Sequence, residues 1–228
     1  MGLVPFEAKS IEIHGRFCTL TATPLKKFKF SAGQFAKVRL APASGQFVVL
    51  SFYSPENEGD VRFLFSLDGG EVKWGLSQLR RKDLFYAEGP FGIFTLRNTS
   101  APKVFFAKKA GIVPLYSMVR TLLSRKSCPP IYIFSENISR EEIPDEAGLR
   151  KCASRKEVFL SIALLNQKPL NWDGKLGEFG PDDISGHVRD FGKAEYYVCG
   201  PVQFVNRMRS ALHGLRIQEK KIFFEQWG

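Results

Sequence analysis

The apolar residues of this chain follow two different patterns, one before and one after the polar segment at residues 98–102. In the first hundred residues, apolar and polar positions alternate in short runs, which lie at residues 11–13, 28–30, 35–40, 47–52 and 61–67. A period of two is typical of strands with one buried face, and short strands at such intervals predict an antiparallel sheet that closes into a barrel. One short helix is predicted at residues 77–81.

After the polar segment, the apolar runs become continuous and alternate with helical patterns. Strands are predicted at residues 103–107, 131–134, 157–164, 196–199 and 222–224, and helices at residues 113–124 and 203–212. Strands that alternate with helices predict a mainly parallel, doubly wound sheet, whose ligands bind at the carboxyl ends of the strands. The sequence therefore predicts two domains, an antiparallel β-barrel at residues 1–100 and an α/β domain at residues 101–228.

The chain is basic, with 33 Lys and Arg against 23 Asp and Glu and a net charge of +10. This surplus favours phosphate-bearing ligands, nucleic acid, anionic lipid or an acidic protein, and charge alone does not choose among them. Nucleic acid is disfavoured because the basic residues are dispersed and form no binding motif. No apolar run approaches the ~20 residues that span a bilayer. The N-terminus resembles no signal peptide, so a cytoplasmic protein is expected.

The four cysteines and three histidines do not form a metal-binding pattern. Cys18, Cys128, Cys152 and Cys199 are far apart in the sequence, without the short spacings that hold zinc or an iron–sulfur cluster. We therefore expect no metal site, and we expect reduced thiols because no secretion signal is present.

Several short motifs occur in an order and at a spacing that resemble the ferredoxin–NADP reductase-like family of FAD/NAD(P)-binding oxidoreductases. They are Ala32-Gly33-Gln34-Phe35, Ser51-Phe52-Tyr53-Ser54, Gly75-Leu76-Ser77-Gln78-Leu79, Glu88-Gly89-Pro90-Phe91-Gly92-Ile93-Phe94, Ala110-Gly111-Ile112-Val113-Pro114, Tyr197-Val198-Cys199-Gly200-Pro201 and Phe224-Glu225-Gln226-Trp227. The resemblance covers nearly the whole chain. It implies that the barrel binds FAD and that the α/β domain binds NAD(P)H.

The resemblance assigns cofactor contacts in the barrel to Ser51, Phe52, Tyr53 and Ser54. Tyr53 would stack on the isoalloxazine ring, and Ser54 would lie near flavin N5 as a catalytic residue. The alternative interpretation is that Tyr53 is a core aromatic of a strand. Ser51 departs from the family, which has an arginine for the pyrophosphate at this position, and serine lacks the charged fork of arginine. The arginines that we consider as replacements are Arg39, Arg62 and Arg80.

Gly75, Leu76 and Ser77 resemble the family's second phosphate-binding element, where a glycine permits close backbone approach at a helix N-terminus. Ser77 would equally cap a helix that begins near Gln78 without any ligand. Gly89 and Gly92, which bracket Pro90, predict a tight turn between the last barrel strands.

In the α/β domain, the family's Gly-Gly-Thr-Gly turn corresponds to Lys108-Lys109-Ala110-Gly111. Gly111 is kept, whereas the two lysines either point away and neutralise phosphates or fill the cofactor's space. A basic strand end at the surface is the alternative interpretation.

The resemblance places Cys199, Gly200 and Pro201 near the nicotinamide, with Cys199 as a catalytic residue. It places Glu225 (catalytic) and Trp227 over the flavin. Cys199 is otherwise a small buried apolar residue, and a C-terminal tryptophan packs on any apolar surface.

We interpret the chain as an enzyme in which NAD(P)H delivers a hydride to FAD, with electrons passing to a separate acidic protein such as ferredoxin or flavodoxin. An NAD(P)H:flavin reductase that uses flavin as a substrate and a non-catalytic flavin-binding protein remain alternatives. The choice between NADH and NADPH stays open, because Glu136 would suit a ribose diol and Arg140 a 2′-phosphate.

Overall fold

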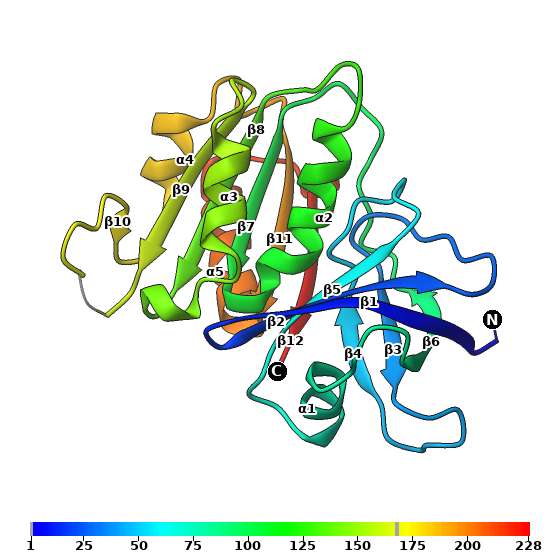
Figure 1. The fold of residues 1–228 in the computed structure, drawn as a ribbon. Helices are drawn as coiled ribbons and strands as arrows, with labels where there is room; N and C mark the ends of the chain where they lie inside the picture. Colours follow the sequence, from blue (N-terminus) through cyan, green and yellow to red (C-terminus); the bar gives the residue numbers. More distant parts are fainter. Residues whose placement is uncertain (1, 167–168) are drawn as a thin grey trace. The chain divides into compact units, whose positions relative to one another are not determined.

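The computed structural model describes residues 2–166 and 169–228. The chain divides into two compact units. The first unit comprises Met1–Leu96 with Tyr116–Thr121, and the second comprises Arg97–Leu115 with Leu122–Gly228. Each unit contains one six-stranded sheet (Figure 1).

The first unit is an antiparallel sheet of strands in the order β4-β3-β6-β1-β2-β5. Its strands are β1 (Val4–His14), β2 (Phe17–Pro24), β3 (Phe35–Arg39), β4 (Val48–Ser51), β5 (Val61–Ser66) and β6 (Leu84–Phe91). An antiparallel bridge between Phe52 and Phe63 joins the two edge strands β4 and β5. The sheet therefore closes on itself, which confirms the predicted barrel.

Aromatic residues fill the interior of this barrel. The rings of Phe30 and Phe52 stack with centroids 4.1 Å apart, and those of Phe6 and Phe85 stack at 5.4 Å. Residues 28–30 contribute to this core but form no strand, so the predicted strand there is wrong. An alternation of only three residues does not distinguish a strand from a loop that buries two phenylalanines.

Helix α1 (Glu71–Ser77) lies earlier than the predicted helix at residues 77–81, which is therefore wrong. The chain leaves β5 through Gly69 and Gly70, whose φ angles of +141° and +91° favour glycine and let the helix begin directly afterwards. After Ser77, the Asp83 side chain accepts a hydrogen bond from the Arg80 backbone N–H, which holds a turn.

The predicted turn at residues 89–92 is also wrong, because Gly89 and Pro90 lie inside β6. Gly89 has a φ of +149°, and a Cβ there would lie 3.2 Å from the Phe35 carbonyl oxygen. The pairing of β3 with β6 shifts register opposite this point. The glycine is thus required by a strand irregularity rather than by a turn.

The second unit is a parallel sheet in the order β10-β9-β8-β7-β11-β12. Its strands are β7 (Lys103–Lys108), β8 (Ile131–Asn137), β9 (Val158–Leu164), β10 (Lys175–Leu176), β11 (Glu195–Pro201) and β12 (Ile222–Trp227), and its helices are α2 (Ile112–Leu123, whose central residues belong to the first unit), α3 (Glu146–Ala153), α4 (Pro181–His187) and α5 (Val202–Gly214). This confirms the predicted parallel α/β sheet. Three short elements, β10, α3 and α4, were not predicted.

The strand order reverses between β7 and β11. From β7 the chain proceeds to β8, β9 and β10 on one side, and it then returns to place β11 and β12 on the other side (Figure 1). Helices α4 and α5 cover one face of the sheet with Ile184, Phe204 and Met208. Such a reversal opens a crevice at the carboxyl ends of the strands, where doubly wound folds bind ligands.

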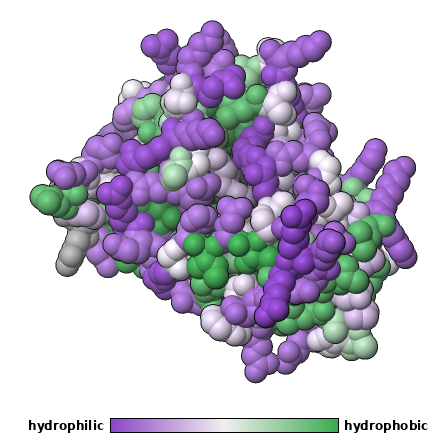
Figure 2. Space-filling model, in the orientation of Figure 1, coloured by the Kyte–Doolittle hydropathy of each residue, from purple (hydrophilic) through white to green (hydrophobic). Residues whose placement is uncertain are grey.

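Hydrophilic side chains dominate the face that Figure 2 shows. Among the described residues, no helix has both the length and the apolar character that crossing a membrane requires.

Candidate functional site

The strand reversal brings three sequence-predicted residues together in the second unit. Ala107 at the end of β7 pairs with Cys199 on β11, and Cys199 pairs with Glu225 on β12. Gly111 follows β7 in a short 3₁₀ turn that leads into α2. Residues separated by more than a hundred positions thus meet at the carboxyl edge of the sheet.

Gly111 and Gly200 permit close packing at this edge. A Cβ on Gly111 would lie 2.1 Å from the carbonyl oxygen of Cys199 and 2.6 Å from its carbonyl carbon. A Cβ on Gly200 would lie 2.6 Å from the Phe204 ring. Pro201 then ends β11 and precedes the first residue of α5. Glycine at position 111 is therefore a steric requirement, because the obstructing atoms belong to the backbone.

Burial sets the protonation of Cys199 and Glu225. Cys199 is fully buried, and this burial, with a smaller contribution from the Glu225 charge, raises the pKa of its thiol well above the ordinary range. Burial also raises the pKa of the Glu225 carboxyl to about 7. At neutral pH, Cys199 is a neutral thiol, whereas Glu225 is able to hold or release a proton.

Lys108 points toward the neighbouring strand β8. Its Nζ lies 3.6 Å from Glu136 Oε2 and 3.8 Å from Glu178 Oε1. Lys109 has a φ of +53°, and its Nζ lies 3.3 Å from Glu142 Oε2. The position is therefore one where the backbone favours glycine, and a lysine occupies it with strain.

Glu136 is a fully buried carboxylate at the end of β8. Arg207 Nη2 lies 2.7 Å from each of its oxygens, and the Phe179 backbone N–H donates to it at 2.8 Å. Its acceptor positions are thus engaged by protein groups. Arg140, the other residue considered for nucleotide preference, binds Glu146 at 2.8 Å.

Arg207 and Glu178 were missed by the sequence analysis. Arg207 lies 71 residues from Glu136 in the chain, and no motif spacing connects the two. The sequence indicated only that Arg207 is a basic residue in the predicted helix at residues 203–212, and it did not indicate a partner for that residue.

Replacing Lys109 with glycine is expected to stabilise the protein. An L-residue in the left-handed region costs roughly 1–2 kcal/mol, and the unfolded-state entropy of glycine returns about 0.5–1 kcal/mol of that gain. Denaturant unfolding of Lys109→Gly should therefore show a gain of up to about 1 kcal/mol. Lys156→Gly, at an exposed lysine without a positive φ, is the control and should not stabilise. A loss at position 109 would mean that the Lys109–Glu142 ion pair outweighs the strain.

In the first unit, the predicted flavin contacts are largely buried. Tyr53 is 5% exposed, and its ring stacks on Tyr116 of the same unit at 5.1 Å and 28°. The Ser54 hydroxyl accepts the Arg62 backbone N–H at 3.0 Å. Phe52 belongs to the barrel core, and Ser51 ends β4. Stacking of a flavin on Tyr53 would require Tyr116 to move aside.

Gly75, Leu76 and Ser77 lie at the C-terminal end of α1. The Ser77 hydroxyl donates to the Trp74 carbonyl oxygen at 2.7 Å, and a Cβ on Gly75 would meet Leu40 Cδ1 at 2.3 Å. Both predictions that placed Ser77 at a helix N-terminus are therefore wrong. Gly75 packs here against the side chain of Leu40.

Two of the three arginines considered as replacements for the family's arginine have carboxylate partners. Arg39 Nη2 lies 3.2 Å from Glu88 Oε2. Arg62 forms an ion pair with Glu58. Arg80 is exposed.

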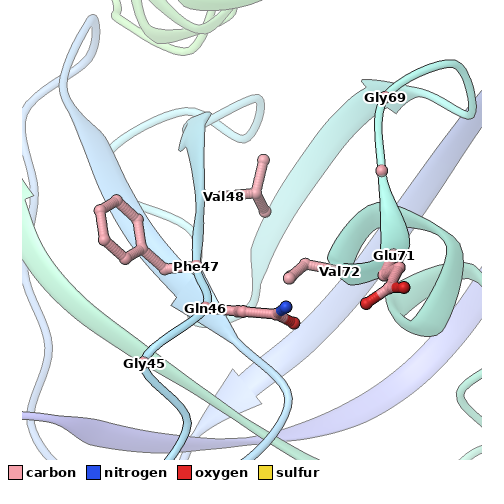
Figure 3. A pocket seen from close by; sticks show the side chains of 8 residues that line it. Gly45, Gln46, Phe47, Val48, Gly69, Glu71 and Val72 are labelled. Carbon is pink, nitrogen blue, oxygen red and sulfur yellow. The ribbon is translucent and has the colours of Figure 1, made fainter.

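The first unit contains a pocket of about 540 Å³ between the start of β4 and the start of α1 (Figure 3). Gly45, Gln46, Phe47, Val48, Gly69, Gly70, Glu71 and Val72 line it. Its volume falls in the range of ~300–1,000 Å³ that small-molecule and cofactor sites occupy. Its lining is mostly apolar residues and glycines, with Gln46 and Glu71 as the polar side chains.

No protein-family model matches the chain. The electron transfer component of 2-halobenzoate 1,2-dioxygenase from Burkholderia cepacia is 27% identical over 92% of this chain and 62% of that protein. The reductase component of phenol 2-monooxygenase from Pseudomonas sp. is 28% identical over 87% of this chain and 58% of that protein. This chain thus spans about three fifths of the length of these two relatives. Ferredoxin–NADP reductase B from Sorangium cellulosum is 24% identical, with 98% of each chain covered.

Solved structures share the fold. The FAD/NAD-binding domain of nitric oxide dioxygenase from Vibrio cholerae has a TM-score of 0.85 at 17% identity, covering 99% of this chain and 98% of that chain. The cytochrome b5 reductase domain of Ulva prolifera nitrate reductase also has a TM-score of 0.85, at 14% identity, covering 98% of this chain and 97% of that chain.

Proposed function

Because its curated relatives and structural neighbours point to the ferredoxin–NADP reductase-like family of FAD/NAD(P)-binding oxidoreductases, we propose that this chain is an FAD-dependent oxidoreductase that uses NAD(P)H. The observation that carries the proposal is the meeting of Gly111, Cys199 and Glu225 at the strand reversal of the second unit. A tight backbone turn there lies beside a carboxyl group with a near-neutral pKa.

The residues of the second unit have separate roles in this proposal. Gly111 lets the turn after β7 pack against the Cys199 backbone, which holds the carboxyl ends of β7 and β11 together where the nicotinamide would bind. Cys199 supplies a neutral, water-excluding wall because its thiol is buried. Glu225 holds or releases a proton at its carboxyl group near neutral pH. When bound, FAD would accept a hydride from NAD(P)H and pass the electrons on.

The residues of the first unit fit FAD unevenly. The pocket beside α1 has the volume of a small-molecule site, but its one charged lining residue is Glu71, which does not suit the phosphates of FAD. The Tyr53 ring is covered by Tyr116, so it supports flavin stacking only after Tyr116 moves. We keep Tyr53 and Ser54 as the proposed flavin contacts. The two residues follow Phe52, whose bridge to Phe63 closes the barrel, and they carry the family's tyrosine–serine motif.

The proposed electron acceptor is a separate acidic protein of the ferredoxin or flavodoxin kind. The net charge of +10 supports an acidic partner through electrostatic complementarity. Two of the curated relatives bear names of reductase or electron transfer components of oxygenases, so an oxygenase component is a second acceptor to assay. The cytoplasmic location stays a prediction.

The visible spectrum of the purified protein, recorded before and after anaerobic addition of NADH or NADPH, tests the proposal. We expect flavin bands at about one flavin per chain and bleaching by at least one nucleotide. A chain that binds no flavin even when FAD is supplied would overturn the proposal. A bound flavin that neither nucleotide reduces would indicate the non-catalytic alternative.

A second candidate is an NAD(P)H:flavin reductase that uses flavin as a substrate. The packing of Tyr53 on Tyr116 and the serine at position 51 favour it, since both weaken retention of a flavin. A colourless protein that oxidises NAD(P)H only with added flavin would distinguish this candidate from the first.

Replacing Glu225 with glutamine is expected to remove a pH dependence. The folded pKa of about 7 lies above the ordinary value of 4.5, so the folded state binds more protons between these two values. The wild type should lose stability as the pH rises from about 5 to 8, and Glu225→Gln should lose less. Reduction of bound flavin should likewise change with a pKa near 7 only in the wild type. If stability and flavin reduction depend on pH identically in the wild type and in Glu225→Gln, the group that titrates near pH 7 is not Glu225.

Tyr53 and Tyr116 are expected to act in opposite directions on flavin binding. Tyr53→Ala removes a stacking partner worth roughly 0.5–1.5 kcal/mol beyond its buried area, so FAD affinity should fall up to about tenfold. Tyr116→Ala uncovers the Tyr53 ring and should leave FAD affinity unchanged or increase it. Fluorescence titration of both variants decides this. A loss of affinity in Tyr116→Ala but not in Tyr53→Ala would place the flavin on Tyr116.

A further inference from the structure

Two short basic segments of the first unit flank strand β1. One segment follows β2 and the other precedes β6, and β1 lies between β2 and β6 in the sheet (Figure 1). Together they carry six exposed basic residues, which we call the basic patch: Lys26, Lys27, Lys29, Arg80, Arg81 and Lys82.

Backbone hydrogen bonds hold both segments against β1. The Leu25 N–H donates to the Pro5 carbonyl oxygen at 2.9 Å, and the Lys82 N–H donates to the Ala8 carbonyl oxygen at 2.8 Å. Three residues along a strand span about 10 Å, and neighbouring strands lie about 5 Å apart. The two segments therefore form one continuous surface, although they are distant in the sequence.

The basic patch is not neutralised within the protein. Among the residues that the structure describes, none forms an ion pair or a side-chain hydrogen bond with its six side chains. The carboxylates in the two segments and in the adjoining residues 5–8 are Asp83, which accepts the Arg80 backbone N–H at 2.7 Å, and Glu7. Six cations against two carboxylates leave a net charge of +4. These like charges repel each other, and an anionic surface would compensate them.

An exposed leucine lies on each side of β1 beside these cations. Leu25 is 51% exposed, and Leu84 is 44% exposed. The next residue after Leu84 is Phe85, which lies in the barrel core, so Leu84 faces outward. Aliphatic side chains next to lysine and arginine are typical of surfaces that enter the head-group region of a lipid bilayer.

The composition of the basic patch favours a lipid surface over a protein partner. Four of its six cations are lysines, and protein–protein interfaces are depleted in lysine and enriched in aromatic residues. Phe28, the one aromatic residue of the two segments, packs against the barrel core. Lysine binds phosphate as a flexible point charge, and clusters of about four to eight Lys and Arg residues bind anionic lipids.

We propose that the basic patch binds the surface of an anionic phospholipid bilayer, with its cations at the lipid phosphates and with Leu25 and Leu84 in the head-group region. The attachment is peripheral and reversible, because each cation contributes only about fivefold in affinity. The inference goes beyond the proposed function, and it holds whether or not the chain binds flavin.

Co-sedimentation of the full chain with two kinds of vesicle tests the proposal. Vesicles of phosphatidylcholine mixed with an equal part of phosphatidylglycerol should bind the wild type at low ionic strength, whereas vesicles of phosphatidylcholine alone should not. Added salt should weaken binding, because it shortens the screening length below the ~10 Å found at 0.1 M. Leu25→Ala should weaken the binding that remains at high salt, because this change removes an apolar contact and no charge.

Variants of the basic patch give the expected magnitudes. The triple variant Lys26→Gln, Lys27→Gln, Lys29→Gln should bind the anionic vesicles about 100-fold more weakly than the wild type, since three charges are lost. Arg81→Gln should bind them about fivefold more weakly. All four side chains are exposed, so these variants should keep the circular dichroism spectrum of the wild type.

A second triple variant, Lys126→Gln, Lys156→Gln, Lys220→Gln, is the matched control. It removes the same charge from exposed lysines of the second unit, and it should keep most of the vesicle binding. Equal losses in the two triple variants would show that net charge, and not the basic patch, attracts the lipid. Equal binding of the wild type to both kinds of vesicle, or to neither, would also overturn the proposal. Binding to polyglutamate but not to anionic vesicles, lost only in the first triple variant, would assign the patch to an acidic protein instead.

Discussion

Gly111→Ala is expected to lower both the stability and the activity of this protein more than any other single methyl addition considered. The new Cβ would stand 2.1 Å from the Cys199 carbonyl oxygen, and the obstructing atoms belong to the buried strand β11. Neither group is able to rotate away, so the turn after β7 and the end of β11 must separate. Overpacking of this kind costs about 1–3 kcal/mol and sometimes more.

Activity should fall further than stability does. Cys199 pairs with Glu225, so a displacement of β11 also moves the carboxyl group of Glu225. A misplacement of about 1 Å in a reacting geometry costs on the order of 100-fold in rate. We expect Gly111→Ala to reduce NAD(P)H-dependent flavin reduction by about that factor, measured by stopped-flow on folded protein.

Gly186→Ala is the matched control for this prediction. Gly186 lies within α4, and a Cβ there meets nothing within 4 Å. Because alanine favours a helix by up to about 1 kcal/mol over glycine, this variant should be neutral or more stable. If Gly111→Ala unfolds at the same denaturant concentration as the wild type and its flavin is reduced at the same rate, the turn has room to relax and the prediction is wrong.

Glu195→Ala is expected to be the most destabilising removal of a charge. Lys103 is completely buried at the start of β7, and its Nζ lies 3.0 Å from Glu195 Oε2. Thr99 Oγ1 also accepts from Lys103 at 2.7 Å. Removing the carboxylate leaves a buried ammonium without its counter-charge, which costs about 3–5 kcal/mol.

The destabilisation should depend on pH in a definite direction. Burial lowers the pKa of Lys103, and Glu195 opposes this. Without Glu195 the folded pKa falls further below the unfolded value of 10.5. The unfolded state then binds more protons between the two values, so stability rises with pH in that window. Glu195→Ala should thus be least stable at low pH and recover part of the loss in alkaline buffer.

Two further variants separate the lost charge from lost packing. Glu195→Gln keeps an oxygen that accepts from the Thr99 hydroxyl, as Glu195 Oε1 does at 3.0 Å, but removes the charge, so it should remain destabilised. Adding Lys103→Met removes the stranded ammonium and should restore much of the stability. Lys193→Ala, which breaks an exposed pair with Asp190, should change stability by no more than about 0.5 kcal/mol. An additive double variant would contradict coupling between Lys103 and Glu195.

Local residue order was enough to predict the two kinds of sheet. A period of two marked the barrel strands, and continuous apolar runs such as residues 103–107 marked the parallel ones. The sequence placed Cys199 near the end of one predicted strand and Glu225 just after another, and the structure pairs the two residues on adjacent parallel strands. Gly111 was singled out as a position where a dinucleotide approaches the backbone, and in the structure the backbone of Cys199 lies close to it.

The position of α1 was missed because two signals competed. The Gly69-Gly70 pair, with its positive φ angles, allowed the helix to begin at Glu71. The motif at residues 75–77 resembled a helix start, yet it lies at the C-terminal end of α1, where Gly75 packs against Leu40. A resemblance of three residues does not specify which end of a helix they occupy.

What the sequence determined by itself was the kind of each sheet and the places of most strands and of the two long helices in the second unit, because these follow from local periods. Only the tertiary structure decided which side chains engage each other. Arg207 donates a hydrogen bond to Glu136, although the two residues are 71 positions apart in the sequence. The side chain of Lys73 folds over Gly69, which lines a pocket whose other wall comes from β4. Such contacts depend on side-chain direction and on burial, which appear only when distant segments pack together.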